Sequence, residues 1–290
     1  MILIGFDVGG TNIKAGILDE QRDPVARSEA SFPKQLNYHN IINIMHDMAI
    51  KLLAENNFDK SSVESVGIAS AGAVDVSEGV ILHAYNLDFH GVPIKKEMEQ
   101  FFPGVLVKLI NDANAATLAE HRMGALKGYK NAVLMTLGTG VGGGAILDGK
   151  LFNGGMGHGV ELGHMTLSLD GPMCTCGNKG CIETLCSATW IAKQGRGDAK
   201  TVIDGAKKGD AASMEIFKEY IENLSSAIAS ITSLLDPEII ALGGGVSHAG
   251  DFLFEALRDK VEKKSFFKYP YKIVPARLGN DAGWIGAAIF

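Results

Sequence analysis

Short runs of β-branched and apolar residues that end in glycine mark the first expected strands of this chain. Residues 2–7 form one such run, a glycine turn follows, and residues 13–19 return with polar positions interspersed. Later in the chain, residues 132–137 form a second apolar run, the segment 138–143 is rich in glycine, and residues 144–148 return. Apolar runs of this length bounded by turn residues are typical of β-strands. The pattern therefore predicts two strand–turn–strand units.

The two units resemble each other, although they lie about half a chain apart. Their return strands share the letters Ala-(Gly)-Ile-Leu-Asp, at 15–19 and at 145–148. This similarity suggests a duplicated architecture whose halves face each other, with the two glycine turns meeting at a cleft. The arrangement is similar to that of the actin and hexokinase class, where both hairpins hold the phosphates of a nucleotide. The resemblance implies an α/β, actin/hexokinase-like (ribonuclease H-like) two-domain fold with an interdomain cleft.

Longer apolar stripes at helical spacing predict the main helices. They cover about 38–56 and 212–235, and such stripes normally face a core. Asn280 is a capping residue, and the apolar segment after it predicts a closing helix that ends at Ile289. In the actin class this last helix returns to pack on the first domain.

Two further apolar runs end in residues suited to ligand binding. Residues 105–110 form a strand that leads through a polar segment into a helix at 115–123. Residues 237–246 are typical of a buried parallel strand that runs into three glycines and then a helix from about Gly250. Taken alone, this third glycine cluster is a tight strand-to-helix turn. Together with the two hairpins, it resembles the adenosine-binding segment of actin-class kinases.

Composition limits the class of protein. The chain has 290 residues, of which 46% are hydrophobic and 21% charged, so it is long enough for two globular domains. We expect a small α/β domain of 1–113 plus about 280–290, and a large α/β domain of 114–279. A net charge of −6 without a basic stripe argues against a nucleic-acid partner. No apolar run is long enough to span a membrane. The cysteines described below are expected to stay reduced as metal ligands, which indicates a cytoplasmic protein.

Two common nucleotide motifs do not account for the glycines. The spacing Gly138-x-Gly140-x-x-Gly143 satisfies the dinucleotide fingerprint, but that motif needs a helix after its third glycine, and a strand is predicted here. None of the three glycine clusters contains Gly-Lys-Ser/Thr, which excludes a P-loop. Glycines suit phosphate binding by the hairpins instead, because successive N–H groups can approach a phosphate without a Cβ in the way.

Three thiols and an imidazole form a set suited to zinc. Cys174, Cys176 and Cys181 lie within eight residues, and His164 lies ten residues upstream of the first. Thiolates and an imidazole at short spacing suit tetrahedral Zn²⁺. The alternative is a two-disulfide knot that includes Cys186, but no secretory leader precedes the first strand. Cys186 itself is expected to be a buried helix cysteine that acts as a small hydrophobe.

The segments Glu161-x-x-His164 and Cys-x-Cys-Gly-x-x-Gly-Cys-x-Glu183 resemble the signature of the ROK family of sugar kinases and sugar-responsive repressors. The resemblance extends over essentially the whole chain. It implies ATP-dependent phosphorylation of a hexose or hexose derivative, at the 6-hydroxyl. The implied cofactors are ATP, Mg²⁺ and a structural Zn²⁺. A small-molecule sugar is the implied partner, and a homodimer is a family expectation.

Asp112 is the expected catalytic residue. It follows the strand at 105–110, and ligands bind at the carboxyl ends of strands in such folds. A helix cap at Asn111 or Asp112 is the structural alternative. In the ROK kinases, the aspartate of this Asn-Asp pair is the general base. Asp7, beside the first glycine turn, is expected to be the outer partner of Mg²⁺, although a strand-end aspartate also satisfies turn N–H groups.

The family positions assign the remaining site residues. The expected nucleotide positions are Asp7, Gly9, Gly10, Thr11, Gly138, Thr139, Gly140, Gly243 and Gly244. The expected sugar positions are Gly72, Asn86, Asn111, Asp112, Glu161, His164 and Glu183. His164 is thus expected to serve zinc with one ring nitrogen and a sugar hydroxyl with the other.

One loop departs from the family pattern. Ala71 stands where bacterial glucokinases usually have proline, and no arginine follows Gly72. In the family, this loop and the stretch Tyr85 to Phe89 lie over the sugar. The departure favours an N-acetylmannosamine or β-glucoside kinase rather than a glucokinase. The alternatives outside the kinases are a sugar-sensing ROK regulator, which would carry an N-terminal winged-helix segment, and a sugar-binding protein without catalysis.

Overall fold

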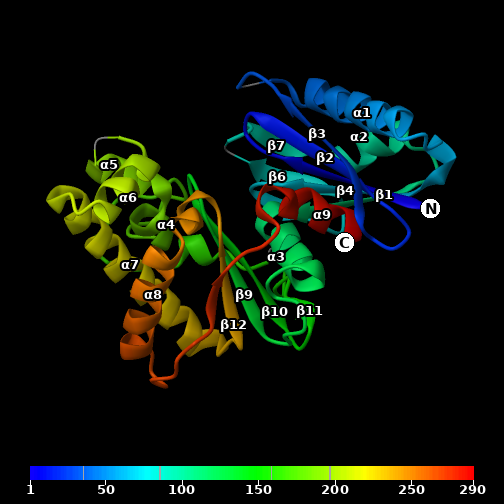
Figure 1. Ribbon diagram of the computed structural model, residues 1–290. Helices are drawn as coiled ribbons and strands as arrows, with labels where there is room; N and C mark the ends of the chain where they lie inside the picture. The colour runs from blue at the N-terminus through cyan, green and yellow to red at the C-terminus, as the bar shows by residue number, and fades with distance from the viewer. Residues whose placement is uncertain (35, 85, 158, 196) are drawn as a thin grey trace. The chain divides into compact units, whose positions relative to one another are not determined.

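The computed structural model describes residues 1–34, 36–84, 86–157, 159–195 and 197–290, and these divide into two compact units (Figure 1). Unit 1 consists of Met1–Ala119, Asn153–Gly159 and Asn280–Phe290. Unit 2 consists of Glu120–Phe152 and Val160–Gly279. The last segment of the chain therefore returns to the unit that contains the first.

Unit 1 is built on a five-stranded sheet with the order β3-β2-β1-β4-β8. Its strands are β1 (Ile2–Val8), β2 (Asn12–Leu18), β3 (Pro24–Ser31), β4 (Val63–Ser70) and β8 (Leu106–Asn111). β1 pairs antiparallel with β2 and parallel with β4, which pairs parallel with β8. A smaller sheet contains β5 (Ala73–Asp75), β6 (Val80–Ala84) and β7 (Phe89–Val92).

Helices cover both faces of the unit 1 sheet. They are α1 (Tyr38–Glu55), α2 (Ile94–Phe101), α3 (Asp112–Met123, which continues into unit 2) and α9 (Ala282–Ile289), with short 3₁₀ turns η1 (Lys60–Ser62) and η4 (Gly279–Asp281). α1 and α2 share a core with the apolar face of β1. α9 contacts β1 and β4 on the other face, where a Cβ at Gly5 or Gly67 would overlap its backbone. These glycines allow the closing helix to lie directly on the sheet, as predicted.

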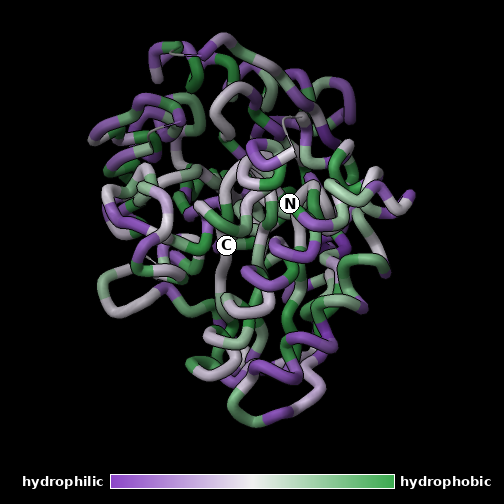
Figure 2. Tube along the Cα trace, turned by 90° about the vertical axis from the view of Figure 1, so that its left-hand side faces the viewer, coloured by the Kyte–Doolittle hydropathy of each residue, from purple (hydrophilic) through white to green (hydrophobic). Residues whose placement is uncertain are grey.

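Unit 2 contains a second five-stranded sheet, with the order β11-β10-β9-β12-β13. Its strands are β9 (Ala132–Leu137), β10 (Val141–Leu147), β11 (Lys150–Leu151), β12 (Ile239–Gly243) and β13 (Ile273–Pro275). Its helices are η2 (Leu162–His164), α4 (Ile182–Cys186), α5 (Ala188–Gly195), α6 (Ala199–Lys207), α7 (Ala211–Leu235), η3 (Gly245–Ala249) and α8 (Asp251–Lys264). Figure 2 shows hydrophilic and hydrophobic residues alternating along the helices, as expected for elements with one buried face.

The two sheets have the same plan. In each, an antiparallel hairpin carries a third strand on one side, and two parallel strands continue the sheet on the other. The duplicated architecture inferred from the repeated hairpins is therefore present, and the fold belongs to the actin/hexokinase-like class. The described part of the chain contains no helix that combines the length and apolar character needed to cross a membrane.

The second glycine turn and the start of α3 differ from the predicted boundaries. The second glycine turn is shorter than predicted, because β10 already begins at Val141 and Gly143 is a strand residue. A Cβ at Gly143 would lie 2.6 Å from Leu162 Cδ1, so this glycine serves close packing rather than a turn. α3 begins at Asp112 rather than at 115, whereas α8 begins at Asp251, as predicted.

Candidate active site

The first glycine turn joins β1 to β2 and carries Asp7 at its edge. Gly9 N–H donates to the Asn12 carbonyl at 2.9 Å, which closes the turn. Asp7 pairs with Lys14 across the hairpin, and its carboxylate lies against Gly283 at the start of α9. The turn also approaches a second expected ligand position, because a Cβ on Gly10 would lie 3.1 Å from the Asn86 carbonyl oxygen.

Asp7 and Asp112 are two desolvated carboxyls of the same unit. Burial, followed by the negative charge of Asp112, raises the pKa of Asp7 from 3.8 to about 6, while the Lys14 ammonium opposes the shift. Burial also raises the pKa of Asp112, against hydrogen bonds from the Ala113 N–H and the Asn111 side chain that lower it. Sequence reasoning missed Lys14, whose place opposite Asp7 follows from the hairpin register. Acids perturbed in this way are typical of functional sites.

The raised pKa of Asp7 makes a prediction about stability. Between pH 3.8 and about pH 6, the folded protein binds more protons at Asp7 than the unfolded chain does, so this group's contribution to stability is lost as the pH rises through that window. Asp7→Asn should therefore gain on the order of 1–3 kcal/mol of unfolding free energy, relative to wild type, between pH 4 and pH 7. Urea denaturation in a chelating buffer measures this difference.

The exposed aspartate Asp23 of the same unit supplies the matched control, Asp23→Asn, for which the difference from wild type should stay flat with pH. If the Asp7→Asn curve runs parallel to wild type across the same window, the carboxyl is not desolvated.

The hydrogen bonds of Asn111 and Asp112 show which of the two residues caps α3. Asn111 Oδ1 accepts from the N–H groups of Ala113 at 3.0 Å and Asn114 at 3.1 Å, which makes Asn111 a helix cap. Asn111 Nδ2 also donates to the Gly72 carbonyl at 3.2 Å, so two expected sugar positions meet. Asp112 Oδ1 accepts from the adjacent Ala113 N–H at 2.8 Å, and no N–H further into the helix is bonded to it among the described residues. Asp112 is thus not needed as the cap.

Gly72 holds a turn that other residues cannot easily form. Its φ is +92°, and a Cβ there would overlap the His83 carbonyl. Glycine adopts this left-handed conformation without steric cost. The turn between β4 and β5 is therefore held by Gly72 itself, and the neighbouring Ala71 is not required for its shape.

In unit 2, the second and third glycine clusters lie side by side. Gly138 follows β9, and a Cβ on Gly244, at φ +81°, would overlap the carbonyl of Leu137, the last residue of that strand. The carbonyls of Gly138 and Thr139 are held from α5, where the Ala188 N–H donates at 2.8 Å and the Thr189 hydroxyl at 2.6 Å. The Gly138 N–H donates to the Gly140 carbonyl at 3.0 Å and closes the turn, so the N–H groups of Thr139 and Gly140 are the candidates for a phosphate. Thr189 was not anticipated, because only the fold brings α5 to this turn.

Glu183 links the glycine turn to the cysteine loop. Its Oε2 accepts from the Val141 N–H at 3.0 Å, and a Cβ on Gly140 would overlap the same oxygen. Its Oε1 lies 4.0 Å from Cys174 Sγ. η2 is also attached here, since a Cβ on Gly163 would overlap the Val141 carbonyl. Glu183, an expected sugar residue, therefore also links the glycine turn to the cysteine loop. The sequence pattern did not predict this link.

The four expected metal ligands form one cluster. The ligand atoms of His164, Cys174, Cys176 and Cys181 all lie within 4.8 Å of one another. The Cys174 Sγ to His164 Nδ1 distance is 3.6 Å, and so is the Cys176 Sγ to Cys181 Sγ distance. Tetrahedral Zn–S and Zn–N bonds place neighbouring ligand atoms about 3.5–3.8 Å apart. The residues thus fit a closed, four-ligand zinc site.

The protonation chemistry of the thiols fits the same assignment. Burial raises the pKa of Cys181 to about 12, whereas a hydrogen bond from the Asn178 N–H lowers the pKa of Cys176. A cation bound in the cluster would favour the thiolate form of Cys181, which burial disfavours. Cys186 is outside the cluster, at 0% exposure within α4, and the four cysteines are free, so the disulfide alternative is not formed.

The expected site residues fall into two groups. Unit 1 carries Asp7, Gly9, Gly10, Thr11, Gly72, Asn86, Asn111 and Asp112, and unit 2 carries Gly138, Thr139, Gly140, Glu161, His164, Glu183, Gly243, Gly244 and the three clustered cysteines. Tyr85, expected over the sugar, lies outside the described residues. Unit 1 thus carries two acids, a glycine turn and expected sugar positions. Unit 2 carries two glycine turns, the cysteine cluster and expected sugar positions.

Comparison with known proteins identifies the family. The family model described as "ROK family" matches residues 3–290. A glucokinase of Thermotoga maritima is 35% identical, over 99% of this chain and 96% of its own length. An N-acetyl-D-glucosamine kinase of Vibrio cholerae is 32% identical, over 98% of this chain and 97% of its own length.

Solved structures agree with the sequence relatives. A ROK family glucokinase from Streptomyces griseus, solved in complex with glucose and AMPPNP, superposes with a TM-score of 0.85 at 31% identity. The similarity covers 100% of this chain and 98% of that one.

Proposed function

The chain belongs to the ROK family and is an ATP-dependent sugar kinase, and we propose that it phosphorylates a hexose or hexose derivative at the 6-hydroxyl with Asp112 as the general base. One observation carries the choice of Asp112. Asn111 caps α3, which leaves the carboxyl at the end of β8 without that structural task. A carboxylate at the carboxyl end of a parallel strand is well placed for a ligand.

Asp112 acts on the acceptor hydroxyl. Transfer of the γ-phosphoryl group requires the sugar oxygen in line with the leaving oxygen, and an acceptor for the hydroxyl proton as the new bond forms. Asp112 orients the 6-hydroxyl through a hydrogen bond and takes its proton. The raised pKa of Asp112 makes the carboxylate a stronger proton acceptor than an exposed aspartate.

The glycine turns receive the nucleotide. The backbone N–H groups of Gly10 and Thr11 in unit 1, and of Thr139 and Gly140 in unit 2, donate to phosphate oxygens, because those of Gly9 and Gly138 are bonded within their own turns. The nucleoside lies against Gly243 and Gly244. Asp7 is a hard carboxylate beside the first turn, and its oxygen chemistry fits Mg²⁺, held through water. When bound, that ion neutralises charge on the β- and γ-phosphates. Lys14, paired with Asp7 across the hairpin, adds positive charge to the same turn.

Each unit carries residues proposed to bind sugar hydroxyls. They are Glu161, His164 and Glu183 in unit 2, and Gly72, Asn86 and Asn111 in unit 1. His164 Nδ1 faces Cys174 Sγ in the cluster, which leaves the opposite ring nitrogen, Nε2, for a hydroxyl. The structural zinc fixes the orientation of that ring and the shape of the loop between His164 and Glu183.

A panel of sugars tests the proposal. Sugar-dependent ADP release is measured with glucose, mannose, N-acetylglucosamine, N-acetylmannosamine, allose and cellobiose, in the presence of Mg²⁺ and Zn²⁺. We expect one sugar to exceed the others in kcat/KM, and the departures at Ala71 and after Gly72 direct attention to N-acetylmannosamine and the β-glucoside. The relatives' names make glucose and N-acetylglucosamine the reference sugars. ADP release that no sugar stimulates would count against the proposal.

A further inference from the structure

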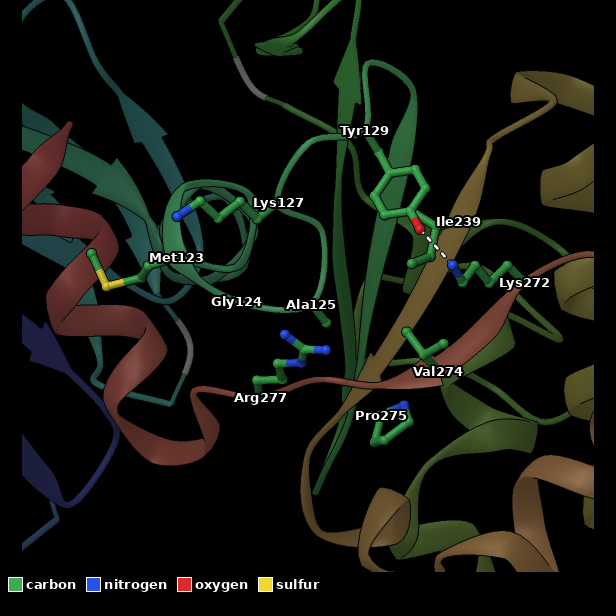
Figure 3. Close-up of a pocket in the computed structure, with 10 residues that line it drawn as sticks. All are labelled: Met123, Gly124, Ala125, Lys127, Tyr129, Ile239, Lys272, Val274, Pro275 and Arg277. Atoms are coloured by element: carbon green, nitrogen blue, oxygen red, sulfur yellow. Dashed lines mark hydrogen bonds between the residues drawn. The ribbon is translucent and has the colours of Figure 1, made fainter.

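Unit 2 contains a cavity that the proposed reaction does not use. Its volume is about 640 Å³, within the range of pockets for small ligands. One wall is the connection from α3 to β9, with Gly124, Ala125 and Tyr129, and the opposite wall is β13 with Val274 (Figure 3). Ile239, at the start of β12, lies between the two walls. The cavity is therefore formed by backbone elements that are fixed by the sheet.

A buried carboxylate holds the two walls together. Glu120 has 0% exposure, and its Oε2 accepts from the Ala125 N–H at 2.6 Å. Its Oε1 accepts from the N–H groups of Arg277 at 2.8 Å and Leu278 at 2.7 Å. Because one side chain bonds both walls, the shape of the cavity is set before any ligand enters, which lowers the cost of binding.

The polar groups of the cavity are cationic. Lys127, Lys272 and Arg277 line it and are exposed, and none of the three has an ion pair among the described residues. The Lys272 ammonium donates to the Tyr129 hydroxyl at 2.6 Å and lies 5.2 Å from the centre of its ring. Figure 3 shows the Arg277 guanidinium pointing towards the loop of Gly124 and Ala125. Unpaired cations in a protein of net charge −6 are available to an anion.

The cavity is distinct from the glycine turns of the same unit. Tyr129 precedes β9 and Ile239 begins β12, whereas Gly138 follows β9 and Gly243 ends β12. The four residue steps from Ile239 to Gly243 span about 13 Å at the rise of a β-strand. A ligand in the cavity therefore lies towards the opposite end of these strands from a nucleotide at the glycine turns.

We propose that this cavity binds a small phosphate monoester as an effector. The dianionic phosphate pairs with the Arg277 guanidinium, which offers a bidentate fork, and with the ammonium of Lys272. The organic body packs on Tyr129, Ile239 and Val274. The residues Glu120 and Arg277 lie, in sequence, close to two of the four places where the chain passes between the units, after Ala119 and after Gly279. A ligand bound in the cavity makes the chain more rigid where it passes between the units, and this changes the kinetic constants of the enzyme.

Direct binding tests the proposal independently of the sugar and of Asp112. AMP, glucose 6-phosphate and inorganic phosphate are titrated calorimetrically into the full-length protein, with Mg²⁺ and a non-hydrolysable ATP analogue saturating the glycine turns. The comparison of AMP with glucose 6-phosphate separates a nucleotide from a sugar phosphate as the source of the group. We expect at least one ester to bind more tightly than inorganic phosphate, because its body adds apolar contacts.

Variants locate the binding. Arg277→Glu should weaken the ester about tenfold or more, since a charge-assisted contact becomes a repulsion, and Lys272→Met should weaken it by a smaller factor. Lys218→Glu makes the same charge change as Arg277→Glu on an exposed lysine of α7 and should leave the affinity unchanged. Thermal unfolding checks that each variant is folded. Absence of binding by both esters, or equal affinity in wild type, Arg277→Glu and Lys272→Met, would overturn the proposal.

Discussion

Asp112→Asn is expected to lower kcat by about 10²- to 10⁴-fold, because loss of a general base in proton transfer costs about that much. The amide keeps the size of the side chain and can still accept a hydrogen bond from the Ala113 N–H at 2.8 Å. Affinities for sugar and nucleotide should therefore change little. Steady-state kinetics combined with equilibrium titration of both substrates separate the loss of turnover from a loss of binding.

Stability measurements distinguish catalysis from helix capping. Burial raises the pKa of Asp112, so the ionised carboxylate is unfavourable in the folded state above its ordinary pKa. Asp112→Asn should thus leave the unfolding free energy unchanged or raise it at neutral pH. Asn111→Ala removes the side chain that caps α3 and should lower it by about 1 kcal/mol.

The two variants are therefore expected to move in opposite directions. A kcat within a few-fold of wild type for Asp112→Asn, accompanied by a loss of stability like that of Asn111→Ala, would show that Asp112 serves the helix and that another residue accepts the proton.

The hairpins and helices of this fold could be predicted because their causes are local. Apolar strands bounded by glycine, the stripe of α1 and the apolar closing helix depend on neighbours in the chain, although Asn280 does not cap that helix, whose N-cap position is Asp281 without a side-chain cap. The repeat of β1 and β2 in β9 and β10 extended this local information to the plan of both sheets. The metal ligands were equally accessible, because three of the four lie within eight residues.

Contacts between distant segments could not be predicted from such patterns. Glu183 meets the Val141 N–H across 42 residues, and Thr189 meets the Thr139 carbonyl across 50. The strand glycine Gly143 was assigned to a turn, because a sequence does not distinguish a glycine needed for φ from one needed for the close approach of Leu162. The effector cavity had no local signal either, since its cations are isolated residues brought together by β13 and the α3–β9 connection.

Cys176→Ser is expected to abolish stoichiometric zinc binding. A hydroxyl is a poor replacement for a thiolate in a closed site of three sulfurs and one nitrogen. Loss of an outer partner of a metal ligand already costs 10- to 100-fold in affinity, so loss of the ligand itself should cost about 100-fold or more. Since His164 and Glu183 lie at the two ends of the loop that zinc holds, sugar affinity should fall with the metal.

The nucleotide should be affected less than the sugar, but not spared. Glu183 carries the disturbance from Cys174 to the Val141 N–H at the end of the second glycine turn, whereas the first turn belongs to unit 1. Zinc content of the purified variant, with sugar and nucleotide titrations on the same sample, measures the three effects together. An equal loss of both affinities would mean that the zinc loop supports the whole of unit 2.

The matched control removes a cysteine outside the cluster. Cys186 is at 0% exposure in the core beside α7, where serine would bury a hydroxyl, so Cys186→Ala is the cleaner change. It should keep one zinc per chain and normal sugar affinity, and lose only packing energy. Full zinc in Cys176→Ser, or zinc lost from Cys186→Ala, would contradict the ligand set of His164, Cys174, Cys176 and Cys181. The metal would then be bound by a different set of residues.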